Sequence, residues 1–363
     1  MSGLRVETVE SVEGIGAMRD AWNDLHAKSR SQTVFLTCDW LYAWSETYAT
    51  GGECSPHALT IWKDKDLLAI APFAIRKDKF GPFRLRTLTF LGTPEASSDY
   101  LDVIVRSGKE KDAADVLYGY LFGTARSLWD RLQFVDVPCD SPFFHWFLKL
   151  LEADGKHFDA VIGSFCPIAS LPETREGFFR NLTVSGRQTF NRESKILAKR
   201  GRVDHERVIG IRAIEALGAF VDLYETRWTS RDERFALFLK TYVGRASGEE
   251  TVRIDFLKVD GRVVAGLFHL RHRDTESMYL MAVDRAFEPR VSIGNIVVGM
   301  CIGRAIKEGA RTYDFLKGDE PYKFRWARGG RRQMDIRVHG PAPGALLHFT
   351  WRTLKSLVKV ALR

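Results

Sequence analysis

One order of secondary structure occurs twice in this chain of 363 residues. Each half predicts a β-hairpin, then a strand, then an amphipathic helix and then another strand. The hairpins cover residues 57–78 and 252–274, and the second contains Asp260-Gly261, a dipeptide typical of tight hairpin turns. This repeat predicts an α/β fold with an internal duplication, although few residues are identical between the halves.

The segment between the two halves, residues 171–208, is rich in Arg and Lys. Its pattern predicts helix, and Ser170 or Thr174 supplies a side chain that suits a helix start. We therefore expect an N-terminal domain over residues 1–168, a C-terminal domain over 169–340 and a separate helix over 341–363.

Composition limits the class of protein. The first residues contain acids and glycines where a signal peptide needs a basic start and an apolar run. No stretch approaches the roughly 18 to 20 apolar residues that span a bilayer. We therefore expect a cytoplasmic protein without an integral membrane segment.

Neither a disulfide framework nor a metal site is expected. The five cysteines form no CxxC pair. His269 and His272 are three apart on a predicted strand, so their side chains point to opposite faces. We therefore expect no metal.

The formal net charge of +8 is concentrated at the C-terminal end, where residues 321–363 hold ten Lys or Arg and one acid. As a helix, residues 345–363 form an amphipathic segment that carries no acid. Such a helix suits an anionic membrane surface, here the inner face of the cytoplasmic membrane. The alternative is a helix packed on the protein's own core. The apolar face would contain Leu347, Trp351, Leu354, Val358 and Ala361, and the basic face Arg352, Lys355, Lys359 and Arg363.

A strand–loop–helix segment near residue 290 is a candidate phosphate site. A predicted strand ends at Val283, and a helix begins near Asn295. Unpaired N–H groups at a helix start attract phosphates, and Gly294 lets a ligand approach the backbone closely. The alternative is a turn without a ligand. The candidate residues are Arg290, Val291, Ser292, Ile293, Gly294 and Asn295.

The run D-F-x-x-G-x-x-x-Y-K-x-x-W, from Asp314 to Trp326, is the most specific motif. With residues 171–326 around it, the chain resembles the CelD-type acetyltransferases of the GNAT superfamily, named for an association with cellulose biosynthesis. It is also similar to Fem-type peptidyltransferases. The first half matches only weakly, through residues 97–105. The resemblance implies two tandem GNAT-like domains, each a mixed, mostly antiparallel sheet flanked by helices.

The resemblance also implies an acyl-CoA co-substrate, bound in the C-terminal domain with its pyrophosphate on the 290–295 loop. In that scheme Tyr322 protonates the leaving thiolate, and Lys323 polarises the thioester or binds phosphate. The base is His269, Asp314 or Asp319. Asp314 has an alternative role in accepting backbone hydrogen bonds. His269 lies on a strand that we expect to face the cleft, and its alternative is a core residue without a catalytic role.

The expected activity is acyl transfer from CoA to an amine. The basic tail favours a lipid or long-chain amine at the membrane surface, and N-acylation of a sphingoid base, as in ceramide synthesis, is its most concrete form. Three alternatives stay open: acetylation of a sugar in exopolysaccharide assembly, a Fem-type transfer from aminoacyl-tRNA, and a GNAT binding module without catalysis. Nucleic acid is expected only under the tRNA alternative.

Overall fold

A computed structural model describes residues 3–50, 52–80, 83–225, 233–246, 248 and 250–340. The chain forms two compact units. Unit 1 contains Met1–Gly163 and Arg332–Arg363, and unit 2 contains Ser164–Arg331. Unit 2 is therefore inserted between two segments of unit 1. The helix expected over 341–363 lies outside the described residues, and the domain limits at 168 and 340 remain predictions.

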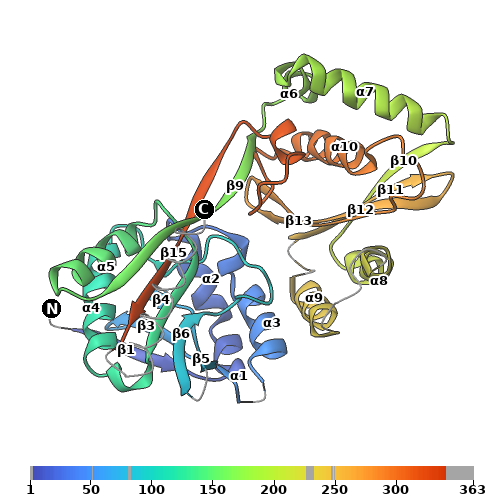
Figure 1. Cartoon of the computed structure of the whole chain (residues 1–363). Coiled ribbons are helices and arrows are strands. Elements are labelled where there is room, and N and C mark those ends of the chain that lie inside the picture. The colour runs from blue at the N-terminus through green and yellow to red at the C-terminus, as the bar shows by residue number, and fades with distance from the viewer. Residues whose placement is uncertain are drawn as a thin grey trace. The chain divides into compact units, whose positions relative to one another are not determined.

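Unit 1 is built on two groups of strands (Figure 1). A four-stranded sheet has the order β1-β3-β4-β7. A second group has the order β15-β8-β6-β5-β2. Five α-helices of this unit accompany them among the described residues. The strands are β1 Leu4–Val9, β2 Cys54–Pro56, β3 Ala58–Lys63, β4 Asp66–Ala71, β5 Phe73–Phe80, β6 Phe83–Phe90, β7 Ile104–Val105, β8 Arg131–Pro138 and β15 Gly329–His339, and the helices are α1 Val12–Ala17, α2 Arg19–Ala27, α3 Cys38–Tyr48, α4 Glu110–Phe122 and α5 Pro142–Ala153.

The first predicted hairpin is confirmed as β3 and β4, which pair antiparallel. The continuation of that hairpin differs from the prediction. Pro72 interrupts the chain because it has no N–H to donate to a strand ladder, and β5 beyond it belongs to the second group of strands. β1 was not predicted, and it pairs with β3.

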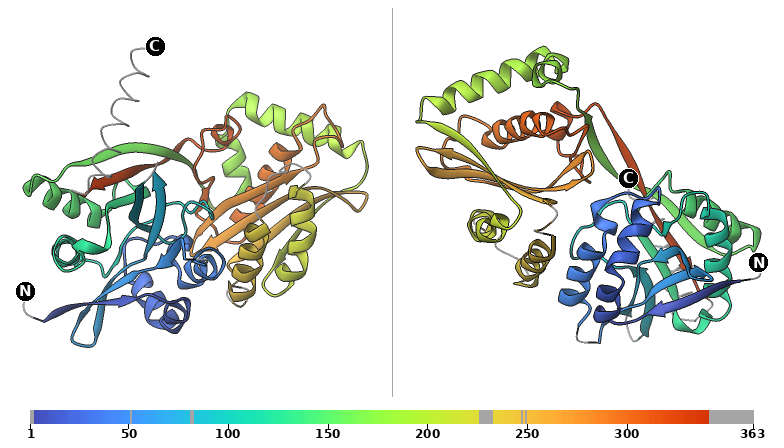
Figure 2. Two further views of the ribbon diagram at one scale, coloured as in Figure 1. Left: turned by 60° about the horizontal axis from the view of Figure 1, so that its bottom comes forward. Right: turned by 180° about the vertical axis from the view of Figure 1, so that it is seen from behind.

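Unit 2 contains one sheet with the order β10-β11-β12-β13-β14-β9. Its pairs are antiparallel except β13 with β14, which is parallel. α10 covers one face with α6 and α7 outside it, and α8 and α9 lie on the opposite face (Figures 1 and 2). The elements are β9 Phe158–Ser170, α6 Arg175–Asn181, α7 Val184–Ala198, β10 Val203–Ile209, α8 Arg212–Glu225, α9 Glu233–Ala246, β11 Val252–Val259, β12 Arg262–His272, β13 Thr275–Val283, α10 Ile293–Lys307 and β14 Thr312–Asp314.

The prediction of helix across residues 171–208 is correct only in part. Thr174 caps α6, whereas Ser170 belongs to β9. Leu182 has an extended backbone, which ends α6, and the next threonine, Thr183, caps α7. The end of the segment is β10 because it pairs with β11 along its whole length. Both halves of the chain thus build α/β units of mixed sheets flanked by helices, as the fold prediction states.

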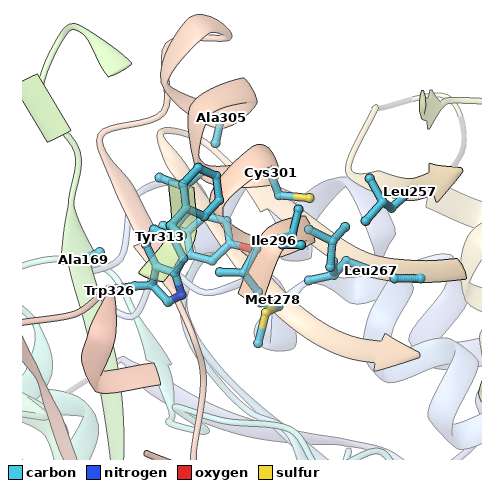
Figure 3. Packing of buried hydrophobic residues seen from close by; sticks show 14 of the residues in the cluster. Ala169, Leu257, Leu267, Met278, Ile296, Cys301, Ala305, Tyr313 and Trp326 are labelled. Atoms are coloured by element: carbon cyan, nitrogen blue, oxygen red, sulfur yellow. The ribbon is translucent and has the colours of Figure 1, made fainter. Parts of the chain in front are cut away.

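The core of unit 2 forms where α10 meets the sheet and α7 (Figure 3). Gly299 makes this packing possible. A Cβ at this position would lie 2.7 Å from Cη2 of Trp326 and closer still to the ring of Phe190. Both aromatic side chains are buried, so neither has space to move away. No described helix is long and apolar enough to cross a membrane.

Candidate active site

A cleft of about 520 Å³ opens where α10 begins. Five of the six predicted cofactor residues line it, all except Arg290. The end of β13 forms one wall, and the 320–322 segment contributes two further side chains. The lining residues are Met281, Val283, Arg285, Pro289, Val291, Ser292, Ile293, Gly294, Asn295, Glu320 and Tyr322.

The residues of the first turn of α10 line this cleft. Ser292 is the N-cap, and its hydroxyl accepts a hydrogen bond from the Asn295 N–H at 3.4 Å. The earliest N–H groups of a helix have no partner within the helix and carry partial positive charge. At Gly294, a Cβ would lie 3.3 Å from the sulfur of Met281, whose flexible side chain has to shift only slightly.

Arg290 supports the loop through a buried carboxylate. Its guanidinium bonds Glu288 at 2.9 and 3.0 Å, and Arg200 bonds the same side chain. Hydrogen bonds from Arg290 and then from Arg200 lower the pKa of Glu288 to about 2, so this carboxylate is ionised at neutral pH. Arg290 thus fixes the loop that leads into α10.

The strand beside the cleft is only partly paired. β14 pairs with β13 from Thr275 to Ser277, and β13 continues beyond this pairing to Val283. From Met278 onward, the edge of β13 that faced β14 is open in the described pairing. Its backbone groups are therefore free of β14, and the cleft lies at the same end of the strand.

The motif residues divide into two groups. Tyr322 is half-buried and lines the cleft. Lys323 is buried, and its ammonium donates to the carbonyls of Lys317 at 2.7 Å and Leu316 at 3.3 Å. It also pairs with Glu320 at 2.9 Å. These bonds give Lys323 a role in holding the loop that carries Tyr322, and it is not among the residues that line the cleft.

The two aspartates of the motif segment also differ. Asp314 is buried and accepts the Leu316 N–H at 2.8 Å, which agrees with its predicted backbone-fixing role. Asp319 is exposed, and neither aspartate lines the cleft.

Comparison with known proteins now identifies the chemistry. Residues 184–324 match the family of GNAT acetyltransferase domains. This segment is a GNAT acetyltransferase domain. The chain is accordingly an acyltransferase, and the GNAT fold implies an acyl-CoA co-substrate and an amine acceptor. No curated protein matches the sequence significantly.

Solved structures share the two-unit fold at low identity. FemX has a TM-score of 0.62 at 12% identity, covering 91% of this chain and 98% of FemX. The C-terminal domain of a putative lysylphosphatidylglycerol synthetase from Agrobacterium fabrum has a TM-score of 0.53 at 12% identity, covering 94% of this chain and 97% of that domain. A tandem GNAT protein from the clavulanic acid biosynthesis pathway has a TM-score of 0.50 at 9% identity, covering 93% and 100%. These similarities show the fold alone.

His269 lies in the interior of the GNAT domain, so the expectation that it faces the cleft is wrong. Its side chain is fully buried, its Nε2 lies 2.6 Å from the hydroxyl of Tyr313, and its Nδ1 lies 3.0 Å from Asp255. The position of the strand explains the error, because β12 lies in the middle of the sheet and helices cover both of its faces.

The interior also contains a network of charged groups around Arg207. Its guanidinium bonds Asp255 at 2.9 Å and Glu276 at 2.6 Å, and both carboxylates are fully buried. Burial alone would raise the pKa of Asp255, but hydrogen bonds from His205 and His269 and the charge of Arg207 hold it well below its usual range. Glu276 is near the start of β13 and the cleft is at its end, so this network stabilises the sheet away from the cleft.

Two sets of described side chains within this network have the spacing of metal ligands: His205 with Asp255 and Cys301, and Asp255 with His269 and Glu276. Both sets include Asp255, whose two oxygens already accept hydrogen bonds from Arg207. The guanidinium supplies the positive charge that these buried carboxylates need, which argues against a cation in the same place.

Sequence reasoning missed two charged residues of the cleft, Glu320 and Arg285. Glu320 stands between Asp319 and Tyr322 in the motif, so its position was the available signal. Arg285 follows the end of β13 by two residues, and no motif marks it.

Proposed function

We propose that the GNAT domain binds an acyl-CoA in the cleft at the start of α10 and transfers the acyl group to a primary amine. The observation that carries this proposal is the meeting of a helix N-terminus with Tyr322 and Glu320 in one cleft. The N–H groups of the first α10 turn suit the CoA pyrophosphate. The open edge of β13 suits the two amides of the pantetheine arm, since a strand edge pairs with extended amide groups.

The transfer needs three proton movements. A base removes a proton from the ammonium of the acceptor, and the neutral amine attacks the thioester carbonyl. The C–N bond forms, the C–S bond breaks, the attacking nitrogen loses a second proton, and the departing thiolate takes a proton, so that one proton is released in all. Tyr322 is our candidate for the donor of the proton that the thiolate takes, and N–H groups near the thioester stabilise the oxyanion.

For the base we propose Glu320. Its side chain lines the cleft together with Tyr322, and one of its carboxylate oxygens pairs with Lys323 at 2.9 Å, whereas His269 and Asp314 are buried elsewhere and Asp319 does not line the cleft. The Glu320→Gln variant should lose the basic group with little change in shape, and its kcat should fall by on the order of 10². Unchanged kcat in this variant would return Asp319 to consideration.

For the acceptor we propose a lipid or long-chain amine, with a sphingoid base as the most concrete case, at the inner surface of the membrane. The support is the sequence of residues 345–363, whose basic and apolar residues suit an anionic interface. The motif from Asp314 to Trp326 further supports a place among the CelD-type acetyltransferases. We assign the acyl-CoA site to unit 2 alone and the membrane contact to residues 345–363.

Mass spectrometry of the purified protein tests this function. A bound long-chain acyl-CoA or lipid amine would support it, acetyl-CoA alone would favour the sugar alternative, and bound tRNA would favour the Fem-type alternative. Vesicle sedimentation tests the tail: Arg352→Glu, Lys355→Glu and Lys359→Glu together should abolish binding to anionic vesicles and leave turnover of a soluble short amine intact. Wild-type protein that does not sediment with anionic vesicles would refute the membrane assignment.

A further inference from the structure

A polar cavity of about 500 Å³ lies on one face of the strands β5, β6 and β8 in unit 1. Side chains alternate between the two faces of a strand, and the other face of these strands carries Phe73, Phe90 and Phe134 in mutual contact. The strands thus bury aromatic rings on one side and present polar groups on the other. A cavity of this volume is large enough for a small-molecule ligand. Its polar lining includes Arg76, Asp78, Thr89, Thr93, Arg131 and Gln133.

Asp78 and Arg131 form the fixed part of this lining. Nη2 of Arg131 donates to Oδ2 of Asp78 at 2.6 Å and to the hydroxyl of Thr87 at 2.9 Å, and that hydroxyl donates to the same carboxylate oxygen at 2.6 Å. Oδ1 of Asp78 takes no part in these bonds, and the side chain of Asp78 is 30% exposed. A carboxylate oxygen is therefore held in place where it can accept a hydrogen bond from a ligand.

Three polar side chains of the lining make no hydrogen bond within the described residues, those of Thr89, Thr93 and Gln133. Thr89 is 6% exposed and Thr93 is 4% exposed. Both hydroxyls nevertheless keep accessible surface, so they open to the cavity. A hydroxyl group donates and accepts hydrogen bonds, and so does the amide of Gln133. A ligand rich in hydroxyl groups can pair with all three side chains.

The two guanidiniums of the lining are already paired with carboxylates. Nη2 of Arg76 donates to Glu95 at 2.8 Å, and Arg131 is bonded to Asp78. Because these pairs balance the charges of both arginines, the arginines do not require an anionic ligand. Nε and Nη1 of Arg76 make no hydrogen bond within the part of the chain that the structure describes, so they remain as donors.

The lining thus combines donors, acceptors and hydroxyls with the apolar side chains of Leu85, Pro94 and Val135. A sugar matches this combination, because its hydroxyls donate and accept while its C–H groups pack on apolar side chains. A nucleobase favours an aromatic ring to stack on, and the described lining contains none. An extended peptide needs an open strand edge, and β6 is paired on both sides.

We propose that the cavity on β5, β6 and β8 binds an uncharged sugar. Asp78 and Arg76 are the charged partners of its hydroxyls, and Thr89, Thr93 and Gln133 are the neutral ones. The inference goes beyond the proposed function and does not depend on it, since all these residues belong to unit 1.

Saturation-transfer NMR titrations with glucose, galactose, mannose and N-acetylglucosamine test the assignment. Wild-type protein should bind at least one of these sugars saturably. Thr89→Val replaces the hydroxyl by a methyl group of similar size, and should weaken that sugar by about 2- to 10-fold, the equivalent of one lost hydrogen bond. Gln133→Met lies on a different strand and should act in the same direction, so the test does not rest on one variant.

Thr8→Val is the matched control, because Thr8 is exposed on β1 and lies outside the lining. It should bind the sugar as wild type does, and circular dichroism should show that all three variants are folded. Absence of saturable binding by all four sugars would overturn the proposal. Unchanged sugar affinity in both Thr89→Val and Gln133→Met would also overturn it. The affinity for CoA should be the same in all these proteins, so failure of the sugar site leaves the acyl-CoA cleft intact.

Discussion

The Gly299→Ala substitution tests the packing that builds the GNAT domain. In the middle of a helix, Ala is favoured over Gly by about 1 kcal/mol. Here the added Cβ would lie 2.7 Å from Trp326 and closer to Phe190, inside normal contact distance of two buried rings. Overpacking of this kind costs about 1–3 kcal/mol and more where rigid rings meet. We therefore expect a net loss of up to about 2 kcal/mol in the free energy of unfolding.

Gly218→Ala is the matched control, because Gly218 is also within a helix, α8, and a Cβ there would meet no atom within 4 Å. It should gain up to about 1 kcal/mol, and because both variants share this helix-propensity gain, they should differ by the overpacking cost of about 1–3 kcal/mol. Urea denaturation followed by circular dichroism measures the difference. Equal stability of the two variants would refute the inference that α7 and Trp326 pack directly against α10 at this glycine.

Three further predictions concern charge and catalysis. Arg207→Met removes the cation that bonds both Asp255 and Glu276, two fully buried carboxylates, and should lower the free energy of unfolding by about 3–5 kcal/mol in urea denaturation. Because the folded-state pKa of Asp255 is held well below its usual value, its stabilising contribution is present above about pH 4 and is lost as pH falls below that. Urea unfolding from pH 6 to 3 should show a shallower decline for Asp255→Asn than for wild type. Tyr322→Phe should lower kcat by on the order of 10² to 10⁴ without a change in melting temperature, and wild-type turnover would exclude Tyr322 as the acid.

Structural features that depend on a few neighbouring residues could be predicted from the sequence. The turn at Asp260-Gly261 was predicted because that dipeptide suits the positive φ of a tight hairpin turn, and both residues have it. The cleft loop was predicted because a strand, a short loop and a helix with Gly294 in its first turn follow one another within a short segment. Thr174 likewise marks the start of α6, since a cap acts within three residues.

Side-chain roles that depend on distant partners could not be predicted. Arg207 is 48 residues from Asp255, and nothing in the local pattern of β10 indicates that the two form a buried pair. His269 is a candidate base by residue type alone, and the fold encloses it beside Tyr313. Lys323 and Tyr322 are adjacent in the motif, but their side chains have different surroundings. Lys323 donates to carbonyls of its own loop, whereas Tyr322 lines the cleft.

The acyl-CoA cleft at the start of α10 is the central claim, and the affinity of the protein for CoA tests it most directly. Calorimetry of wild type, Gly294→Ala and Gly294→Val provides the comparison. A Cβ at this position is 3.3 Å from the flexible Met281 sulfur, so Ala should be nearly neutral. Val adds two methyl groups against the same turn and should weaken CoA by at least about 10-fold, corresponding to one lost charge-assisted hydrogen bond. If the folded Val variant binds CoA as tightly as wild type, the pyrophosphate does not lie on this turn.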